Sequence, residues 1–199
     1  MDLREQKRQL RQQALARREA QEDREGLSQT ILGRFLALPA YQQARTVMLY
    51  IGIRSEVHTR PYVPGILASG RRVAVPYCRG QQLGLFELHD LSELERCGFG
   101  LWEPPLARRG DADRQVDVKD LDLIAVPGVA FDRRGARLGH GKAYYDRLLH
   151  TVRPDAVLAG LAFECQIFPQ VPTGKLLDVD EFQLQGQHAE QQVLVGIHR

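Results

Sequence analysis

Residues 121–147 read LDLIAVPGVAFDRRGARLGHGKAYYDR, an apolar run followed by a glycine-rich loop and then a segment of helix formers. The run at 121–126 is typical of a strand buried on both faces, and it ends at Pro127-Gly128. Residues 142–150 are predicted to form a helix. A buried strand that leads through a loop into a helix is the start of a βαβ unit, so this stretch favours a parallel sheet.

The same alternation extends outward in both directions. Further strands are predicted at 47–53, 72–76, 83–88 and 157–163, and a possible edge strand at 193–199 after the polar tract 183–192. Helices are predicted over 1–38, interrupted at Gly26, and within 60–69, where Gly70 lies near the C-cap; 103–120 is predicted to be a surface loop. Strands separated by helical segments indicate an α/β fold with a mainly parallel sheet covered by helices.

The composition is that of an ordinary globular chain. Its 199 residues suggest one domain, at roughly 150 residues per domain, and 43% hydrophobic with 26% charged residues argues against disorder. Three scattered cysteines favour a reducing compartment over disulfides or zinc. Neither a signal peptide nor a long apolar run is present, so we expect a cytoplasmic protein without a membrane segment.

The net charge of +2 gives no global basic field for nucleic acid, although the N-terminal segment is basic. Its basic residues outnumber Asp2 and Glu5 and comprise Arg4, Lys7, Arg8, Arg11, Arg17 and Arg18. This excess is either a solvated helix face or part of a site.

The glycine-rich loop has the properties of a phosphate-binding site. Gly135, Gly139 and Gly141 allow close backbone approach, and Lys142 stands at the expected helix start, where free N–H groups attract anions. Arg137 adds a second cation. The spacing matches neither a dinucleotide fingerprint nor a Walker A motif, so a glycine turn with incidental charge is the alternative.

Other candidate residues have two readings each. Asp146, four residues after Lys142, is either a salt-bridge partner on the same helix face or a Mg²⁺ ligand. Glu56 follows the first strand, where α/β sheets bind ligands, but a loop glutamate is usually solvated. His58 is a general base or a surface imidazole. Phe99 and Trp102 either pack in the core or stack on a flat ring.

Several segments together resemble one family, the 5-formyltetrahydrofolate cyclo-ligases, also called 5,10-methenyltetrahydrofolate synthetases. The matching pieces follow the family's order over about residues 4–175 and are 7–11 (KRQLR), 56–59 (EVHT), 99–104 (FGLWEP), 122–132 (DLIAVPGVAFD) and 137–146 (RLGHGKAYYD). The resemblance implies a three-layer α/β/α fold and one domain over 1–199. It also implies an ATP- and Mg²⁺-dependent, C–N bond-forming ligase of one-carbon metabolism that converts 5-formyltetrahydrofolate to 5,10-methenyltetrahydrofolate.

The resemblance also implies roles for individual residues. The N-terminal segment 1–38 would contribute to the ATP site, and ATP would contact Lys7, Arg8, Gln9, Leu10, Arg11, Arg137, Leu138, Gly139, His140, Gly141, Lys142, Ala143, Tyr144 and Tyr145. Lys142 and Arg137 would be catalytic, neutralising the transferred phosphoryl group. Folate would contact Arg11, Ile51, Glu56, His140 and Tyr144, with Phe99 or nearby Trp102 at the pterin. Asp146 and Asp178 would bind Mg²⁺, and the chain would be a monomer.

Three positions depart from the family pattern. His58 stands where the family usually has Asp, and Ala143 replaces a commoner glycine. Residues 174–182 match only loosely, so that the second metal position falls on Leu177 without a gap, with Asp178 adjacent. Two alternatives therefore remain: an ATP-dependent enzyme of the same fold with another pterin-like or thiamine-related substrate, and a non-catalytic folate- or nucleotide-binding protein.

Overall fold

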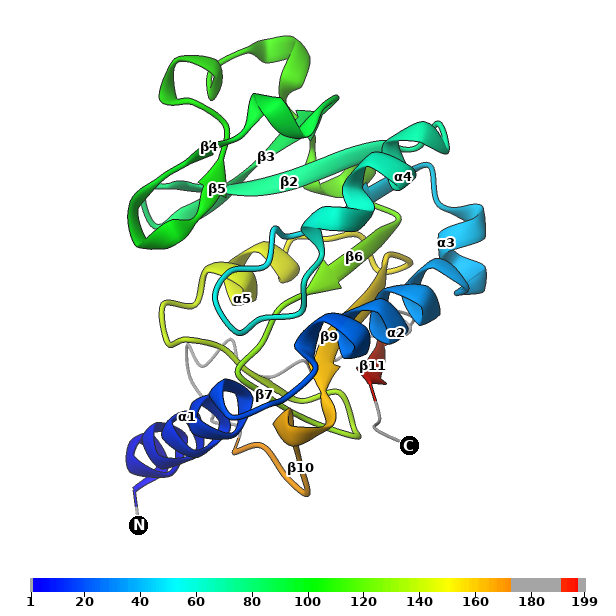
Figure 1. The fold of residues 1–199 in the computed structure, drawn as a ribbon. Coiled ribbons are helices and arrows are strands. Elements are labelled where there is room, and N and C mark those ends of the chain that lie inside the picture. The colour runs from blue at the N-terminus through cyan, green and yellow to red at the C-terminus, as the bar shows by residue number, and fades with distance from the viewer. Residues whose placement is uncertain (1, 173–190, 197–199) are drawn as a thin grey trace.

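A computed structural model describes residues 2–172 and the backbone of residues 191–196 (Figure 1). Its five α-helices in this part of the chain are α1 (Leu3–Glu19), α2 (Arg24–Leu36), α3 (Pro39–Gln43), α4 (Val63–Ala68) and α5 (Tyr144–Leu149). Short 3₁₀ helices punctuate the loops: η1 (Arg60–Tyr62), η2 (Leu91–Glu93), η3 (Gly98–Gly100), η4 (Leu106–Arg108), η5 (Ala112–Arg114), η6 (Val118–Asp120) and η7 (Glu164–Gln166).

The strands form one large and two small sheets. The central sheet has the order β11-β9-β6-β1-β2-β3, built from Gln191–Gly196, Val157–Phe163, Leu123–Val126, Thr46–Met48, Arg72–Arg79 and Gln82–Leu88. All its neighbours pair in parallel except the β2–β3 hairpin, which confirms a mainly parallel sheet. The smaller sheets are β10-β7-β8 (Ile167–Phe168, Ala130–Asp132, Arg137–Leu138) and β4-β5 (Glu95–Arg96, Trp102–Glu103).

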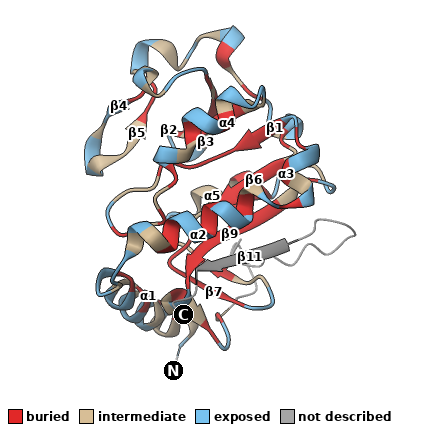
Figure 2. Cartoon of the chain, turned by 45° about the vertical axis from the view of Figure 1, so that its right-hand side comes forward, coloured by how far each residue is buried: buried red, intermediate tan, exposed pale blue. Residues whose placement is uncertain are grey.

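Successive residues of the central strands face two separate hydrophobic clusters. Val47 and Leu123 belong to the cluster under α2 and α4, which includes Phe35 and Ile66. Their neighbours, such as Met48 and Ile124, belong to a second cluster, into which α5 inserts Leu148 and Leu149. Because alternate side chains point to opposite faces of a strand, helices cover both faces. Figure 2 shows the buried residues concentrated along these strands, which confirms the three-layer arrangement.

The strand order reverses between β1 and β6. From β1 the chain crosses through α4 to β2 on one side, whereas β6 leads through α5 to β9 on the other. In open α/β sheets, ligands bind outside the carboxyl ends of the strands at this reversal. The loops that follow Met48 and Val126 therefore mark the place to look for a site.

Helix α1 lies away from the central sheet. It packs on the β10-β7-β8 sheet, where Ala14 joins Val129, Leu138 and Phe168 in a third cluster (Figure 1). Because β7 and β8 follow β6 directly, this packing holds α1 beside the carboxyl end of β6. The N-terminal segment is therefore divided between a layer helix, α2, and a helix placed at the edge of the sheet.

Several expected boundaries were wrong. The helical segment breaks at residues 20–23 and not at Gly26, which lies in the first turn of α2 and donates its N–H to Asp23. The first strand ends at Met48 because the chain then turns through residues 49–58. The loop after β6 contains β7 and β8, and the expected surface loop 103–120 begins in β5 and contains three 3₁₀ helices. The expected edge strand is β11, which ends at Gly196.

The helix expected from residue 142 begins at Tyr144. Ala143 adopts a left-handed conformation at its N-cap, with φ 54°, and α5 has six residues. Lys142 therefore precedes the helix, and the predicted shared helix face with Asp146 is wrong.

Candidate active site

Arg18 joins α1 to both loops at the strand reversal. Its side chain is 3% exposed, its Nε donates to Ser55 Oγ at 3.1 Å, and its NH1 donates to the Gly128 carbonyl at 3.4 Å. Ser55 follows β1 and Gly128 follows β6. Ser55 Oγ in turn donates to Glu19 at 2.7 Å. This network fixes the helix against the two strand ends where ligands bind in this class of sheet.

One face of α1 presents basic side chains to the molecule. Lys7, Arg11, Ala14 and Arg18 follow a spacing of four, three and four residues, which places them on one side of a helix. Lys7 is 5% exposed, and Arg11 Nε donates to the Gly139 carbonyl at 2.8 Å. The basic segment is therefore more than a solvated surface: part of it is buried against the glycine-rich loop.

The loop at 139–143 turns tightly beside Arg11. Gly141 has φ +93°, a conformation that L side chains rarely adopt, and a Cβ there would lie 3.6 Å from Arg11 Cζ. Tyr144 Oη donates to the Gly80 carbonyl at 3.0 Å, and Arg147 donates to the Gln81 carbonyl. These contacts fasten the loop to the β2–β3 hairpin, and Lys142 itself is exposed.

Lys142 lies close enough to Cys78 to affect its thiol. Burial and the neighbouring carboxylate of Glu103 raise the pKa of Cys78 to about 11, while the charges of Arg109 and Lys142 oppose this rise. Cys78 is on β2, so the Lys142 ammonium lies near the hairpin side of the loop. Its charge is available on the surface, beside the backbone N–H groups of the turn.

Arg137 and Asp146 form a buried ion pair. Their side chains are 4% and 5% exposed, Arg137 NH2 donates to Asp146 Oδ1, and its NH1 donates to the Pro127 carbonyl at 3.3 Å. The Arg137 guanidinium also lies 6.0 Å from the centre of the Tyr145 ring. Of the two readings for Asp146, the salt bridge is present, although its partner is Arg137 and not Lys142.

Glu56 lies among polar side chains from both halves of the site. The Ile53 N–H donates to Glu56 Oε2 at 3.1 Å, and His140 Nε2 lies 3.8 Å from Oε1. Burial, and then the charge of Glu56, raise the pKa of the Tyr50 and Tyr145 hydroxyls. Glu56 therefore lies beside His140 of the glycine-rich loop, with its carboxylate held by a backbone hydrogen bond.

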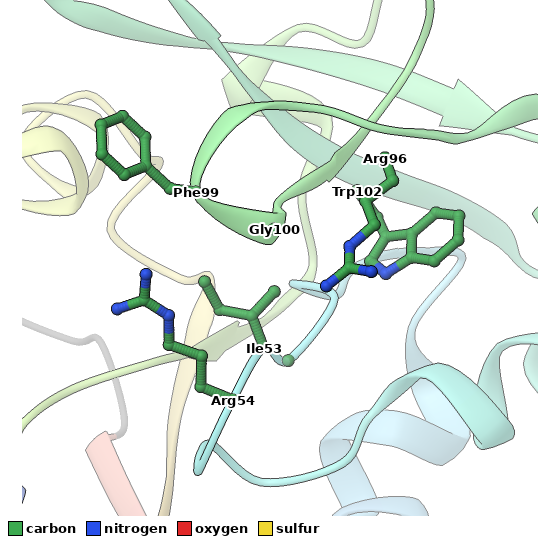
Figure 3. A pocket seen from close by; sticks show the side chains of 7 residues that line it. Ile53, Arg54, Arg96, Phe99, Gly100 and Trp102 are labelled. Carbon is green, nitrogen blue, oxygen red and sulfur yellow. The ribbon is translucent and has the colours of Figure 1, made fainter.

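A cavity of about 370 Å³ opens beside this cluster (Figure 3). The loop after β1 lines one side, and the β4–β5 hairpin lines the other with Phe99 and Trp102. Phe99 is 80% exposed at the hairpin tip, and Arg60 lies over the Trp102 ring at 4.1 Å. Stacking on a ligand is therefore open to Phe99, whereas Trp102 already packs partly against the core.

Most of the remaining predicted site residues lie on the exposed side of α1, in the hydrophobic clusters, or outside the described residues. Arg8 and Gln9 bond to Glu5 on the exposed side of α1, and Leu10 packs in the third cluster. Leu138 and Ile51 are buried in hydrophobic clusters, and the His58 N–H donates to Ser28 Oγ at 2.9 Å. Asp178 and Leu177 lie outside the described residues. Among residues 2–172, no three carboxylate, histidine or cysteine side chains cluster as a metal site.

Arg18, Arg54 and Arg96 were missed as candidates. The spacing of Arg18 from Lys7 and Arg11 could have indicated its inward orientation. Arg54 and Arg96 have no such signal, because only the tertiary structure brings their segments to one cavity. No helix in the described residues is both long and apolar enough to cross a membrane.

Comparison with known proteins identifies relatives along most of the chain. It is 30% identical to the mouse 5-formyltetrahydrofolate cyclo-ligase over 187 residues, covering 88% of this chain and 91% of that protein. The Haemophilus influenzae enzyme of the same name is 29% identical over 150 residues, covering 73% and 78%. The NMR structure of Aquifex aeolicus 5,10-methenyltetrahydrofolate synthetase superposes with a TM-score of 0.73 at 34% identity, covering 85% and 84%. The 5-formyltetrahydrofolate cyclo-ligase family model matches residues 3–182, and the chain belongs to that family.

Proposed function

We propose that this enzyme uses ATP and Mg²⁺ to convert 5-formyltetrahydrofolate to 5,10-methenyltetrahydrofolate. The observation that carries the proposal is the meeting of a buried basic helix face, a tight glycine turn and Glu56 at the strand reversal. A non-catalytic binding protein would not need positively charged side chains from both α1 and the loop after β8 around one ligand. The reaction requires both a polyphosphate region and a folate region.

The polyphosphate would lie along the glycine turn. Arg11 holds the Gly139 carbonyl, and Gly141 leaves space beside the Arg11 guanidinium. Lys7 and Lys142 would supply further positive charge from α1 and from the exposed loop. Phosphoryl transfer depends mainly on positioning and on stabilising charge, so these residues suit the γ-phosphoryl group.

Asp146 fits a magnesium site only as a single carboxylate beside phosphate oxygens. Its Oδ1 accepts from Arg137, so Oδ2 is the oxygen that Asp146 would offer a cation. Mg²⁺ commonly takes one or two protein carboxylates and completes its shell with phosphates and water. When bound, it would neutralise charge on the polyphosphate. Arg137 would then hold the Asp146 carboxylate in place and add positive charge beside the polyphosphate.

The folate would lie between Glu56 and the β4–β5 hairpin. Glu56, oriented by the Ile53 N–H, would accept hydrogen bonds from the pterin, and exposed Phe99 would cover a flat ring. The formyl oxygen attacks the γ-phosphorus, ADP leaves, and the formyl carbon becomes electrophilic. N10 then attacks that carbon, phosphate departs, N10 loses its proton and the five-membered ring closes.

Near-ultraviolet absorbance tests the proposal. Purified enzyme is mixed with 5-formyltetrahydrofolate and Mg²⁺, and the longer-wavelength band of the methenyl product is followed with and without ATP. We expect the band to grow only with ATP. Binding of ATP without growth of the band would favour another pterin-like substrate, and heat protection by both ligands without turnover would favour a binding protein.

Lys142→Ala tests the assignment of the phosphate region. Removing a preorganised cation should slow turnover by about a hundredfold or more, a cost on the order of 3 kcal/mol in the barrier. Lys119→Ala is the matched control, because Lys119 is also an exposed lysine and lies in η6. A Lys142→Ala enzyme with near-normal kcat would remove Lys142 from the transferring phosphoryl group.

A further inference from the structure

Two arginines from distant segments line the cavity next to Glu56. Arg54 comes from the loop after β1 and Arg96 from β4, and the other lining residues include Ile53, Phe99 and Trp102. Figure 3 shows Ile53 and Arg54 on the loop, opposite Phe99 and Gly100 on the hairpin, with Arg96 beside Trp102. The cavity thus combines aromatic surface with two positive charges.

Neither guanidinium is paired with a carboxylate in the part of the chain that the structure describes. Arg54 and Arg96 are both exposed. By contrast, the nearby Arg109 pairs with Glu103 at 2.9 Å. Two guanidinium groups on one cavity give it a positive electrostatic potential. This potential attracts an anionic ligand. Arg forms paired hydrogen bonds with carboxylates especially well.

The backbone is strained on both sides of the cavity. Arg54 has φ 53° and Phe99 has φ 62°, the left-handed region that disfavours side chains. Gly52 is required beside them, because a Cβ there would lie 2.1 Å from the Val57 carbonyl oxygen. Such conformations concentrate at ligand sites, where the surrounding fold maintains them. Here two of the residues that line the cavity, Arg54 and Phe99, are the strained ones.

The cavity adjoins the proposed folate region through Ile53. Ile53 lines it and also donates its N–H to Glu56, whose other oxygen faces His140. A molecule that places its pterin at Glu56 therefore has this cavity beside it, next to Ile53.

We infer that Arg54 and Arg96 bind the carboxylates of the folate's glutamate tail, with the aminobenzoyl part of the substrate in the cavity between them. The inference rests on the proposed function, since it places a folate at Glu56. The aminobenzoyl-glutamate half is flat and aromatic at one end and carries two carboxylates at the other. Both features match what the cavity offers.

Binding of a fragment tests the inference independently of turnover. The probe is 4-aminobenzoyl-glutamate, which has the tail but neither pterin nor formyl group, and its uncharged analogue is 4-aminobenzamide. Affinity is measured by calorimetry with the full chain. The emission of Trp102, the one tryptophan of the sequence, reports entry into the cavity. Arg54→Gln and Arg96→Gln remove the charges, and Arg45→Gln is the matched control, an exposed arginine just before β1.

We expect each cavity variant to bind 4-aminobenzoyl-glutamate at least about tenfold more weakly, because it loses one hydrogen bond to a charged group. Arg45→Gln should match the unsubstituted enzyme, and added salt should weaken the fragment. Equal affinity for 4-aminobenzamide, no binding of the fragment, or unchanged affinity in both variants would overturn the inference. Fragment binding without formation of the methenyl product would support the inference and count against the proposed reaction.

Discussion

The Arg18 guanidinium and the Ser55 hydroxyl lie 3.1 Å apart, and this hydrogen bond links the N-terminal helix to the loop that follows β1. The same guanidinium reaches the Gly128 carbonyl after β6. Lys7 and Arg11 lie on the same face of α1, so their position over the site depends on how this helix is anchored. Arg18 therefore affects ligand binding indirectly, by anchoring the helix that carries Lys7 and Arg11.

Arg18→Ala should lower both stability and turnover. The substitution leaves buried Ser55 Oγ without its arginine donor, which costs about 1–3 kcal/mol, whereas the Gly128 carbonyl keeps its hydrogen bond from Gln166 Nε2 at 2.9 Å. Loss of the anchor should raise the KM for ATP more than that for the folate. Urea unfolding and steady-state kinetics check this, with Arg4→Ala as the control because Arg4 is exposed on the same helix. An Arg18→Ala enzyme with unchanged stability and unchanged KM for ATP would show that the helix needs no such anchor.

Asp146→Asn should produce two separate effects. Without ligands, it removes the charge that faces buried Arg137, and breaking a buried ion pair costs on the order of 3 kcal/mol. During turnover, it should also raise the Mg²⁺ concentration needed for half-maximal rate. Thermal unfolding in a chelator measures the first effect and a Mg²⁺ titration measures the second. A normal Mg²⁺ titration in a destabilised protein would leave Asp146 with a structural role alone.

The parallel core was predictable because its strands are continuous apolar runs. Residues 121–126 and 157–163 have no alternation of polar and apolar side chains, which is the pattern of a strand covered on both faces. The strands β7 and β8 were not predictable, since three and two residues are too few to show a period. The helix start at Tyr144 was missed because Ala143, a good helix former, is left-handed here.

The site was predictable where neighbouring residues supply it and not where the fold assembles it. Glu56 and the glycine turn were indicated by their positions after strands and Arg11 by the family resemblance, and Arg11 and Glu56 do both lie beside the loop. The spacing of Arg18 from Lys7 and Arg11 places all three on one helix face, but the sequence alone does not show that this face is the buried one. The pairing of Arg137 with Asp146 depends on a β8-to-α5 turn that the expected longer helix excluded.

Ala143→Gly should stabilise the protein. Ala143 has φ 54°, where a Cβ costs roughly 1–2 kcal/mol and glycine is not penalised in this way. We expect a gain of about 1 kcal/mol after the extra chain entropy of glycine is subtracted, seen as a higher melting temperature. Ala16→Gly is the control of opposite sign, because Ala16 is an exposed residue inside α1 and glycine there destabilises the helix. A lower melting temperature for Ala143→Gly would contradict the left-handed turn.

Glu93→Gln should reduce the dependence of stability on acid pH. Burial raises the pKa of Glu93, but hydrogen bonds from Arg114 at 2.6 Å, the His89 N–H and Arg108 outweigh it and lower the value to about 2. The unfolded value is about 4.3. Because the folded pKa is the lower one, this stabilisation is present above the unfolded pKa and is lost as the pH falls toward about 2.

Urea unfolding at several pH values between about 5 and 2 measures this contribution, which amounts to about 3 kcal/mol for a shift of this size. Glu93→Gln should be less stable than the unsubstituted protein at neutral pH and should lose less stability over that range. Glu95→Gln removes one carboxylate from exposed β4 and controls for the change in net charge. Parallel curves for Glu93→Gln and the unsubstituted protein would mean that the Arg108 and Arg114 contacts do not hold this carboxylate in its ionised form.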